Sequence, residues 1–125
     1  MPAARRFQGR NEMRIVVLPA EGPVIASEAD ALDLVAEHIG DPPDWIVIPK
    51  ERLAPDFFRL RTGLLGAVTQ KFVNYGLRVA VLGDVSAEIA ASDAFRDFVR
   101  ETNKGSHFRF VTDVGKLRGQ GATPG

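Results

Sequence analysis

The sequence predicts a single small α/β domain with a five-stranded, mixed but mostly parallel sheet and helices packed on it. Two observations lead to this prediction. Short β-branched apolar runs alternate with amphipathic helical segments, which is typical of strands joined by crossover helices. The apolar runs at 45–48 and 77–82 are nearly continuous, as expected for parallel strands buried on both faces. A chain of 125 residues has room for one hydrophobic core.

The first elements are expected to form a hairpin followed by a helix. Residues 14–18 form a short β-branched strand, and a tight turn leads to a second strand over 24–26, which must run antiparallel to the first. Ser27 suits the N-cap of the next helix, whose inner face includes Leu32, and Gly40 suits its end.

The remaining segments alternate between strand and helix. They are expected at 45–48, a short helix from 55, then 62–75, 77–82, 92–102, 107–111 and a terminal helix over 113–117. The predicted order is therefore β-β-α-β-α-β-α-β-(α). The predicted core is apolar and consists of Val16, Ile25, Leu32, Val35, Ile46, Val47, Leu65, Val68, Phe72, Val79, Val81, Phe95, Phe98 and Phe110.

Residues at the two ends of the sequence lack apolar periodicity. We expect a disordered lead-in over 1–12 and a disordered tail over 119–125. No linker or repeat divides the rest, so one folded domain is expected over 13–118.

Composition excludes several classes of protein. Sixteen basic and sixteen acidic residues give zero net charge, which argues against a general nucleic-acid binder. The absence of cysteine excludes disulfides, cysteine metal sites and a cysteine nucleophile. No apolar run is long enough to span a membrane, and the N-terminal residues lack the apolar stretch of a secretory signal. We therefore expect a cytoplasmic protein.

Small polar and acidic residues recur where the predicted parallel strands end. Ligands of parallel sheets bind beyond these ends. One interpretation is a binding or switch site formed by Asp56, Thr62, Asp84 and Ser86. The alternative is that these residues cap helices and form turns, because caps and turns use the same residue types.

Signatures of catalysis are absent from the sequence. It has no nucleophile elbow, zinc-protease motif, phosphate-binding loop or dinucleotide fingerprint. His38 ends an acidic helix, where the helix dipole favours a cation, so a surface role is expected for it. We assign no catalytic residue, no cofactor and no dedicated metal site, and the sequence favours a protein that is not an enzyme.

The charges are unevenly distributed along the chain. Residues 21–44 contain seven acidic residues and no Lys or Arg, whereas residues 50–78 contain six basic and two acidic residues. One explanation is complementary packing of solvated surfaces within one chain; the other is a patch for an anionic partner or for a second copy. The helix over 62–75 would pair with itself in a two-fold contact, so a homodimer is expected.

Four blocks of sequence carry a resemblance to a known family. They are DFFRLRTG from Asp56, QKFVNY from Gln70, GDVS from Gly83 and ETNKG from Glu101. In this order they resemble the bacterial family catalogued as domain of unknown function 4180, which implies a small cytoplasmic protein but no activity. Two positions depart from the family pattern: Ala67 stands where an acidic residue is common, and Thr102 where Ser is usual. The blocks add Gln70, Lys71, Asn74, Tyr75 and Asn103 to the candidate binding residues.

The order of elements also resembles that of STAS domains, which include bacterial anti-sigma-factor antagonists. The stretch Thr62-Gly63-Leu64-Leu65-Gly66 is similar to the Ser-Gly-Leu-Gly stretch that opens the second helix of STAS switches, where the hydroxyl is phosphorylated; Arg61 replaces the usual aspartate. This resemblance implies a non-enzymatic regulatory or protein-interaction module with an unknown protein partner. The alternatives are that Thr62 is only an N-cap, and that the protein is a small-ligand or nucleotide-binding domain with modest enzymatic activity.

Overall fold

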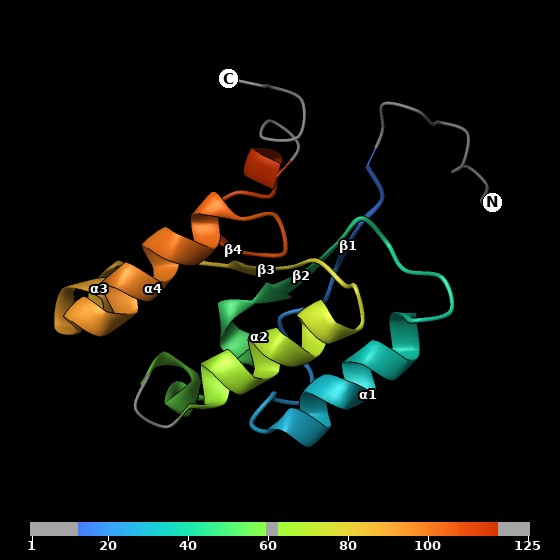
Figure 1. Cartoon of the computed structure of the whole chain (residues 1–125), viewed down its shortest axis with the longest axis horizontal. Coiled ribbons are helices and arrows are strands. Elements are labelled where there is room, and N and C mark those ends of the chain that lie inside the picture. The colour runs from blue at the N-terminus through green and yellow to red at the C-terminus, as the bar shows by residue number, and fades with distance from the viewer. Residues whose placement is uncertain (1–12, 60–62, 118–125) are drawn as a thin grey trace.

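The sheet consists of four parallel strands in chain order. The computed structural model describes residues 13–59 and 63–117. In this part of the chain, strands β1 (Ile15–Val17), β2 (Trp45–Pro49), β3 (Val79–Leu82) and β4 (Phe108–Val111) lie side by side in the order β1-β2-β3-β4. Each strand is therefore paired with the next one along the chain (Figure 1).

Helices connect the strands and pack on one face of the sheet. Helix α1 (Glu28–His38) follows β1, α2 (Leu64–Asn74) follows β2, and α3 (Ser86–Ala91) with α4 (Asp93–Lys104) follows β3 (Figure 1). Right-handed crossovers that always advance to the next strand place every helix on the same side. The segment after β2 forms two 3₁₀ turns, η2 (Lys50–Arg52) and η3 (Pro55–Phe58).

Strand alternation divides the apolar residues into two clusters. Ile46, Val79 and Phe110 face the helices and belong to the larger core. Trp45 and Val47 face the opposite side and form a smaller cluster that contains no residue of α1–α4. Helices α1–α4 thus cover one face of the sheet, whereas the terminal helical turn contributes Leu117 to the other face.

The Ser27 cap expected for α1 is confirmed, and α4 also begins with a serine cap. The Ser27 hydroxyl accepts a hydrogen bond from the amide of Asp30 at 3.2 Å, and the Asp30 carboxylate accepts one from the amide of Ala26 at 2.8 Å. The arrangement differs from a capping box in that Asp30 bonds the residue before the N-cap. At α4, the Ser92 hydroxyl accepts from the amide of Phe95 at 3.1 Å.

The predicted hairpin is wrong, and so are the fifth strand and the mixed character of the sheet. Ile25 forms only an isolated parallel bridge with Leu53, and its backbone bonds to Arg52 and Ala54. The Arg52 side chain also donates to the carbonyls of Pro19 and Pro23. Segment 19–25 is therefore held against the residues after β2 rather than against β1.

Two smaller expectations also need correction. Leu32 is 37% exposed, because the buried side of α1 consists of Ala31, Leu34 and Val35. Helix α3 was not expected at all. The terminal turn was expected and is present, with backbone bonds from Lys116 and Leu117 to Asp113 and Val114, respectively. The expected lead-in and tail lie outside the described residues.

Candidate functional site

A cavity of about 910 Å³ lies beyond the carboxyl ends of β2 and β3. This is the edge where parallel sheets bind ligands, and the volume is within the range of small-molecule sites. Its walls come from the two 3₁₀ turns after β2 and from α3 and the start of α4, and the lining residues are Lys50, Glu51, Leu53, Pro55, Phe58, Arg59, Glu88, Ala91, Ser92 and Ala94.

An ion pair between Lys50 and Glu88 spans one side of the cavity. Lys50 directly follows β2, and its ammonium lies 2.8 Å from the Glu88 carboxylate Oε2 and 2.8 Å from the carbonyl oxygen of Asp84. The two side chains are only 29% and 24% exposed. The ammonium also lies 5.7 Å from the centre of the Phe58 ring, within cation–π range.

One oxygen of the pair has no partner. Oε1 of Glu88 is buried and accepts no hydrogen bond from the part of the chain that the structure describes. Buried polar atoms are normally satisfied, but this oxygen has no accessible surface and is therefore closed to a ligand in the cavity. With Leu53 and Phe58 nearby, the cavity combines an apolar wall with groups of both charges.

A glycine allows the close approach behind this pair. Gly83, which follows β3, has a φ of +153°, and a Cβ built there would lie 2.8 Å from the Cβ of Lys50. No L-residue fits without displacing Lys50. The glycine of the GDVS block thus leaves room for the Lys50 side chain.

Asp84 and Ser86 form an Asx-turn that leads into α3, whose N-cap is Val85 and which has no side-chain cap. The Asp84 carboxylate accepts a hydrogen bond from the amide of Ser86 at 2.9 Å, at the start of α3. Hydrogen bonds from the Ser86 side chain and backbone lower the pKa of Asp84, and the Lys50 charge adds to this. Neither residue lines the cavity, although both lie at its edge of the sheet.

Asp56 lies in η3 and forms an ion pair with Arg59 at 3.2 Å, close to the cavity that Arg59 lines. Thr62 lies outside the described residues. The expected grouping of Asp56, Thr62 and Asp84 therefore stays a prediction.

The four candidates of the QKFVNY block occupy α2 and its end, away from the cavity lining. The Gln70 amide donates to Asn74 at 2.9 Å, and Lys71 forms an ion pair of 3.6 Å with Glu28 of α1. Tyr75 is 49% exposed. The Lys71–Glu28 pair joins the basic and acidic stretches within one chain.

Asn103 bonds internally at the outer edge of the sheet. Its amide nitrogen donates to the carbonyl of Phe110 at 3.2 Å, and its amide oxygen accepts from the Phe110 N–H at 2.8 Å. The side chain thereby makes the hydrogen bonds to β4 that a neighbouring strand would otherwise make. These two hydrogen bonds give Asn103 a structural role that needs no ligand.

The sequence reasoning missed the cavity residues. Lys50 stands directly after a buried strand, so its position alone could have pointed to it. Glu88 could not have been found in the same way, because it belongs to α3, which was not predicted.

Comparison with known proteins identifies the family. The model of a family described as "Domain of unknown function (DUF4180)" matches residues 10–120. The chain belongs to this family. The match covers every helix and strand of the DUF4180 domain, and it confirms the resemblance of the four blocks. No curated protein and no solved structure matches the chain.

Among the described residues of the DUF4180 domain, no group of three or more His, Asp or Glu side chains is placed to hold a metal ion. No helix in that part of the chain has both the length and the apolar character needed to cross a membrane.

Proposed function

We propose that this DUF4180 domain is a non-enzymatic, STAS-like regulatory module that acts by binding another protein at the carboxyl edge of its sheet. One observation carries the proposal. Helix α2 begins after Gly63, with a φ of +74°, and packs against η3, which lines the cavity. The described part of the block that resembles the STAS switch, Gly63–Gly66, therefore opens a helix that packs against a wall of the cavity.

The order of elements supports the STAS-like interpretation. From β1 onward, strands and helices alternate as in the expected order, and helices α1–α4 lie on one face. The expected strand over 24–26 is missing, so the support comes from the elements that remain.

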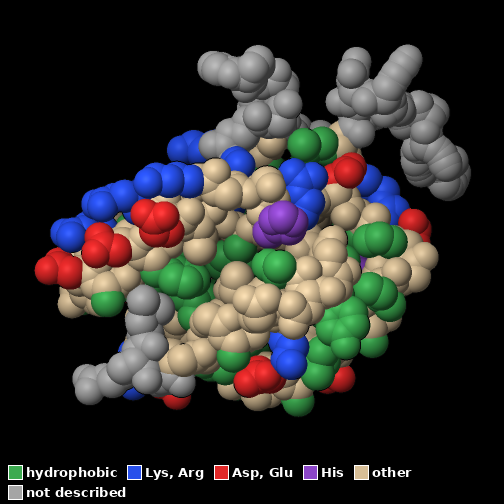
Figure 2. All heavy atoms as spheres, in the orientation of Figure 1, with side chains coloured by type: hydrophobic (Ala, Val, Ile, Leu, Met, Phe, Trp, Pro, Cys, Tyr) green, Lys and Arg blue, Asp and Glu red, His purple; other side chains and the backbone are tan. Residues whose placement is uncertain are grey.

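An exposed apolar surface supports a protein partner. Leu32 and Ile39 of the α1 region are 37% and 45% exposed, and Figure 2 shows hydrophobic side chains gathered over α1. Val73 and Tyr75 are exposed at the end of α2, which packs against α1. Apolar patches of this kind mark interaction sites. Ile39 and Tyr75 follow the ends of α1 and α2 and so lie toward the amino edge of the sheet. The patch therefore supports a protein partner in general and does not support the carboxyl edge in particular.

The switch would be the hydroxyl of Thr62, the residue before Gly63. The N–H groups and dipole of an eleven-residue helix favour a phosphate at its start. Phosphorylation there would add negative charge to the edge that binds the partner. Intact-mass analysis of protein purified from its native host, followed by peptide mapping, is expected to detect this modification.

Quantitative capture from a lysate of the source organism tests the proposal. The wild type, Thr62→Ser and Thr62→Asp are compared with Ser106→Asp, which adds the same charge in the exposed loop before β4. A protein retained by the wild type, Thr62→Ser and Ser106→Asp but lost by Thr62→Asp is the expected result. Equal capture of the partner by the wild type and the three variants contradicts the proposal.

A second candidate function is the binding of a small ligand or nucleotide in the cavity. The volume of the cavity and its lining of apolar and charged side chains, Glu88 among them, favour it. A thermal-shift screen tests it, because a ligand at 100 times its Kd adds about 2.7 kcal/mol of stability. The expected shift is lost in Glu88→Gln but kept in Glu101→Gln, and a screen without any shift removes this candidate.

A further inference from the structure

Two arginines on the sheet face opposite the helices lack a carboxylate partner. Arg78 directly precedes β3, and Arg109 lies in β4. Each donates from Nε to a backbone carbonyl, Arg78 to Ser106 at 2.9 Å and Arg109 to Gly105 at 2.8 Å. Among the residues that the structure describes, neither arginine takes part in an ion pair. Their terminal nitrogens are the unused donors.

Both guanidinium groups lie against one buried indole. Their central carbons are 4.7 Å (Arg78) and 5.8 Å (Arg109) from the centre of the Trp45 ring, so both are in cation–π contact with it. Trp45 is only 2% exposed, and its Nε1–H is buried without an acceptor in the described part of the chain. A buried donor of this kind normally has a partner.

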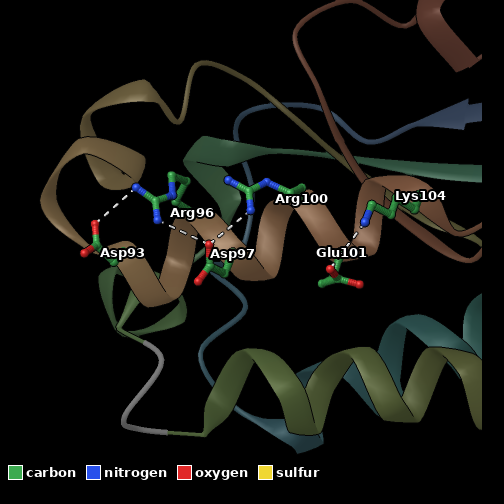
Figure 3. Close-up of polar contacts among 6 residues, drawn as sticks. All are labelled: Asp93, Arg96, Asp97, Arg100, Glu101 and Lys104. Carbon is green, nitrogen blue, oxygen red and sulfur yellow. Dashed lines mark hydrogen bonds and ion pairs between the residues drawn. The ribbon is translucent and has the colours of Figure 1, made fainter.

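The two charges repel each other in a partly dry environment. Burial lowers the pKa of Arg109, and the neighbouring charge of Arg78 lowers it further. The cations of α4 differ, because Arg96, Arg100 and Lys104 all meet carboxylates of their own helix (Figure 3). The sheet arginines are held together with no such compensation.

We propose that Arg78 and Arg109, held together over the Trp45 ring, form a binding site for an oxyanion, the carboxylate or phosphate group of a ligand. A planar guanidinium donates two parallel hydrogen bonds to either group. An anion would neutralise the two arginines. The site shares no residue with the carboxyl-edge cavity, so it is independent of the proposed function.

The single tryptophan of the chain makes the site directly observable. Trp45 is the only tryptophan, so intrinsic fluorescence and the one indole N–H resonance report on this position alone. Inorganic phosphate and acetate are titrated separately, with chloride keeping the ionic strength constant. We expect a saturable change in the emission of Trp45 and a saturable shift of its indole N–H resonance.

Variants separate binding from a general salt effect. Arg109→Gln is expected to weaken the apparent affinity about tenfold or more, because it removes a charged hydrogen-bonding group. Arg78→Lys keeps the charge and an aliphatic stem but loses the planar fork, so it should also weaken binding and serves if Arg109→Gln fails to fold. Arg100→Gln removes the same charge from α4 and should bind like the wild type.

Each outcome decides the proposal. Saturation by phosphate alone identifies a phosphate site, saturation by acetate alone identifies a carboxylate site, and saturation by both identifies a general oxyanion site. No saturable response to either anion overturns the proposal. An unchanged response in folded Arg109→Gln and Arg78→Lys overturns it as well.

Discussion

Lys50 and Glu88 connect the end of β2 to helix α3 through an ion pair of 2.8 Å. The same ammonium donates to the backbone of Asp84 after β3, so one side chain joins three segments at the carboxyl edge. The candidate cavity has this pair as part of its wall. Its shape therefore depends on the lysine.

Lys50→Met should destabilise the fold by about 1–3 kcal/mol, because it leaves the mostly buried Glu88 carboxylate without its cation. Urea unfolding measures the change. Lys71→Met is the matched control, since the Lys71–Glu28 pair is longer and more exposed, and it should change stability by less than about 1 kcal/mol. Equal losses in the two variants would contradict the assignment.

Gly83→Ala should cost about 1–3 kcal/mol through backbone strain and contact with Lys50. Gly66→Ala is the opposite case, because a Cβ at this position in α2 meets nothing within 4 Å, and it should add about 0.5–1 kcal/mol. Thermal unfolding of the two variants checks both signs. If Gly83→Ala leaves the stability unchanged, Lys50 can move away from the new Cβ without cost.

The Asx-turn of Asp84 predicts a pH dependence. Its pKa is lowered in the folded state, so the ionised carboxylate stabilises the fold. This contribution is present above the unfolded pKa of about 3.9 and is lost as the pH falls through the folded value. The stability difference between the wild type and Asp84→Asn should therefore shrink in acid. Asp33→Asn, on an exposed position of α1, controls for the lost charge, and a constant Asp84 difference between pH 7 and pH 2 would reject a stabilising role for the turn.

Asn103→Ala should destabilise the protein by about 1–3 kcal/mol, because it leaves the main-chain groups of Phe110 unpaired. Asn74→Ala removes only an exposed contact along α2 and should cost no more than about 0.5 kcal/mol. Chemical denaturation compares the two. A stable Asn103→Ala variant would return Asn103 to the candidate binding residues.

The predicted homodimer rests on the uneven charges and on the outer face of α2. Light scattering at a protein concentration of about 100 μM in low salt should give the mass of a dimer. Raising the salt from about 50 to about 500 mM should weaken the dimer, since exposed ion pairs are screened over this range. A monomeric mass in low salt rejects the dimer, and a dimer that salt does not affect rejects the charge argument.

Local patterns predicted much of the fold. The periodic stripe of Leu65, Val68 and Phe72 identified α2, and the continuous apolar run at Trp45 identified β2. The hairpin was wrong because turn signals are local, whereas the partners of Ile25 come from residues after β2. Helix α3 has six residues, none of them buried, so no periodic pattern marked it.

The candidate site was harder to predict for a physical reason. Polar residues at strand ends serve in caps, in turns and as ligand contacts alike, and Asp84 forms an Asx-turn. The cavity is lined instead by Lys50 and Glu88, which are far apart in the sequence and meet only after folding.

We propose that charge at Thr62 controls the binding of a protein partner to the carboxyl edge of the sheet. Calorimetric titration of the purified captured partner into the wild type, Thr62→Ser, Thr62→Asp and Ser106→Asp tests this binding. We expect a Kd at least about tenfold weaker for Thr62→Asp, equivalent to about 1.4 kcal/mol, with the other three alike. Equal affinities for all four proteins would contradict it.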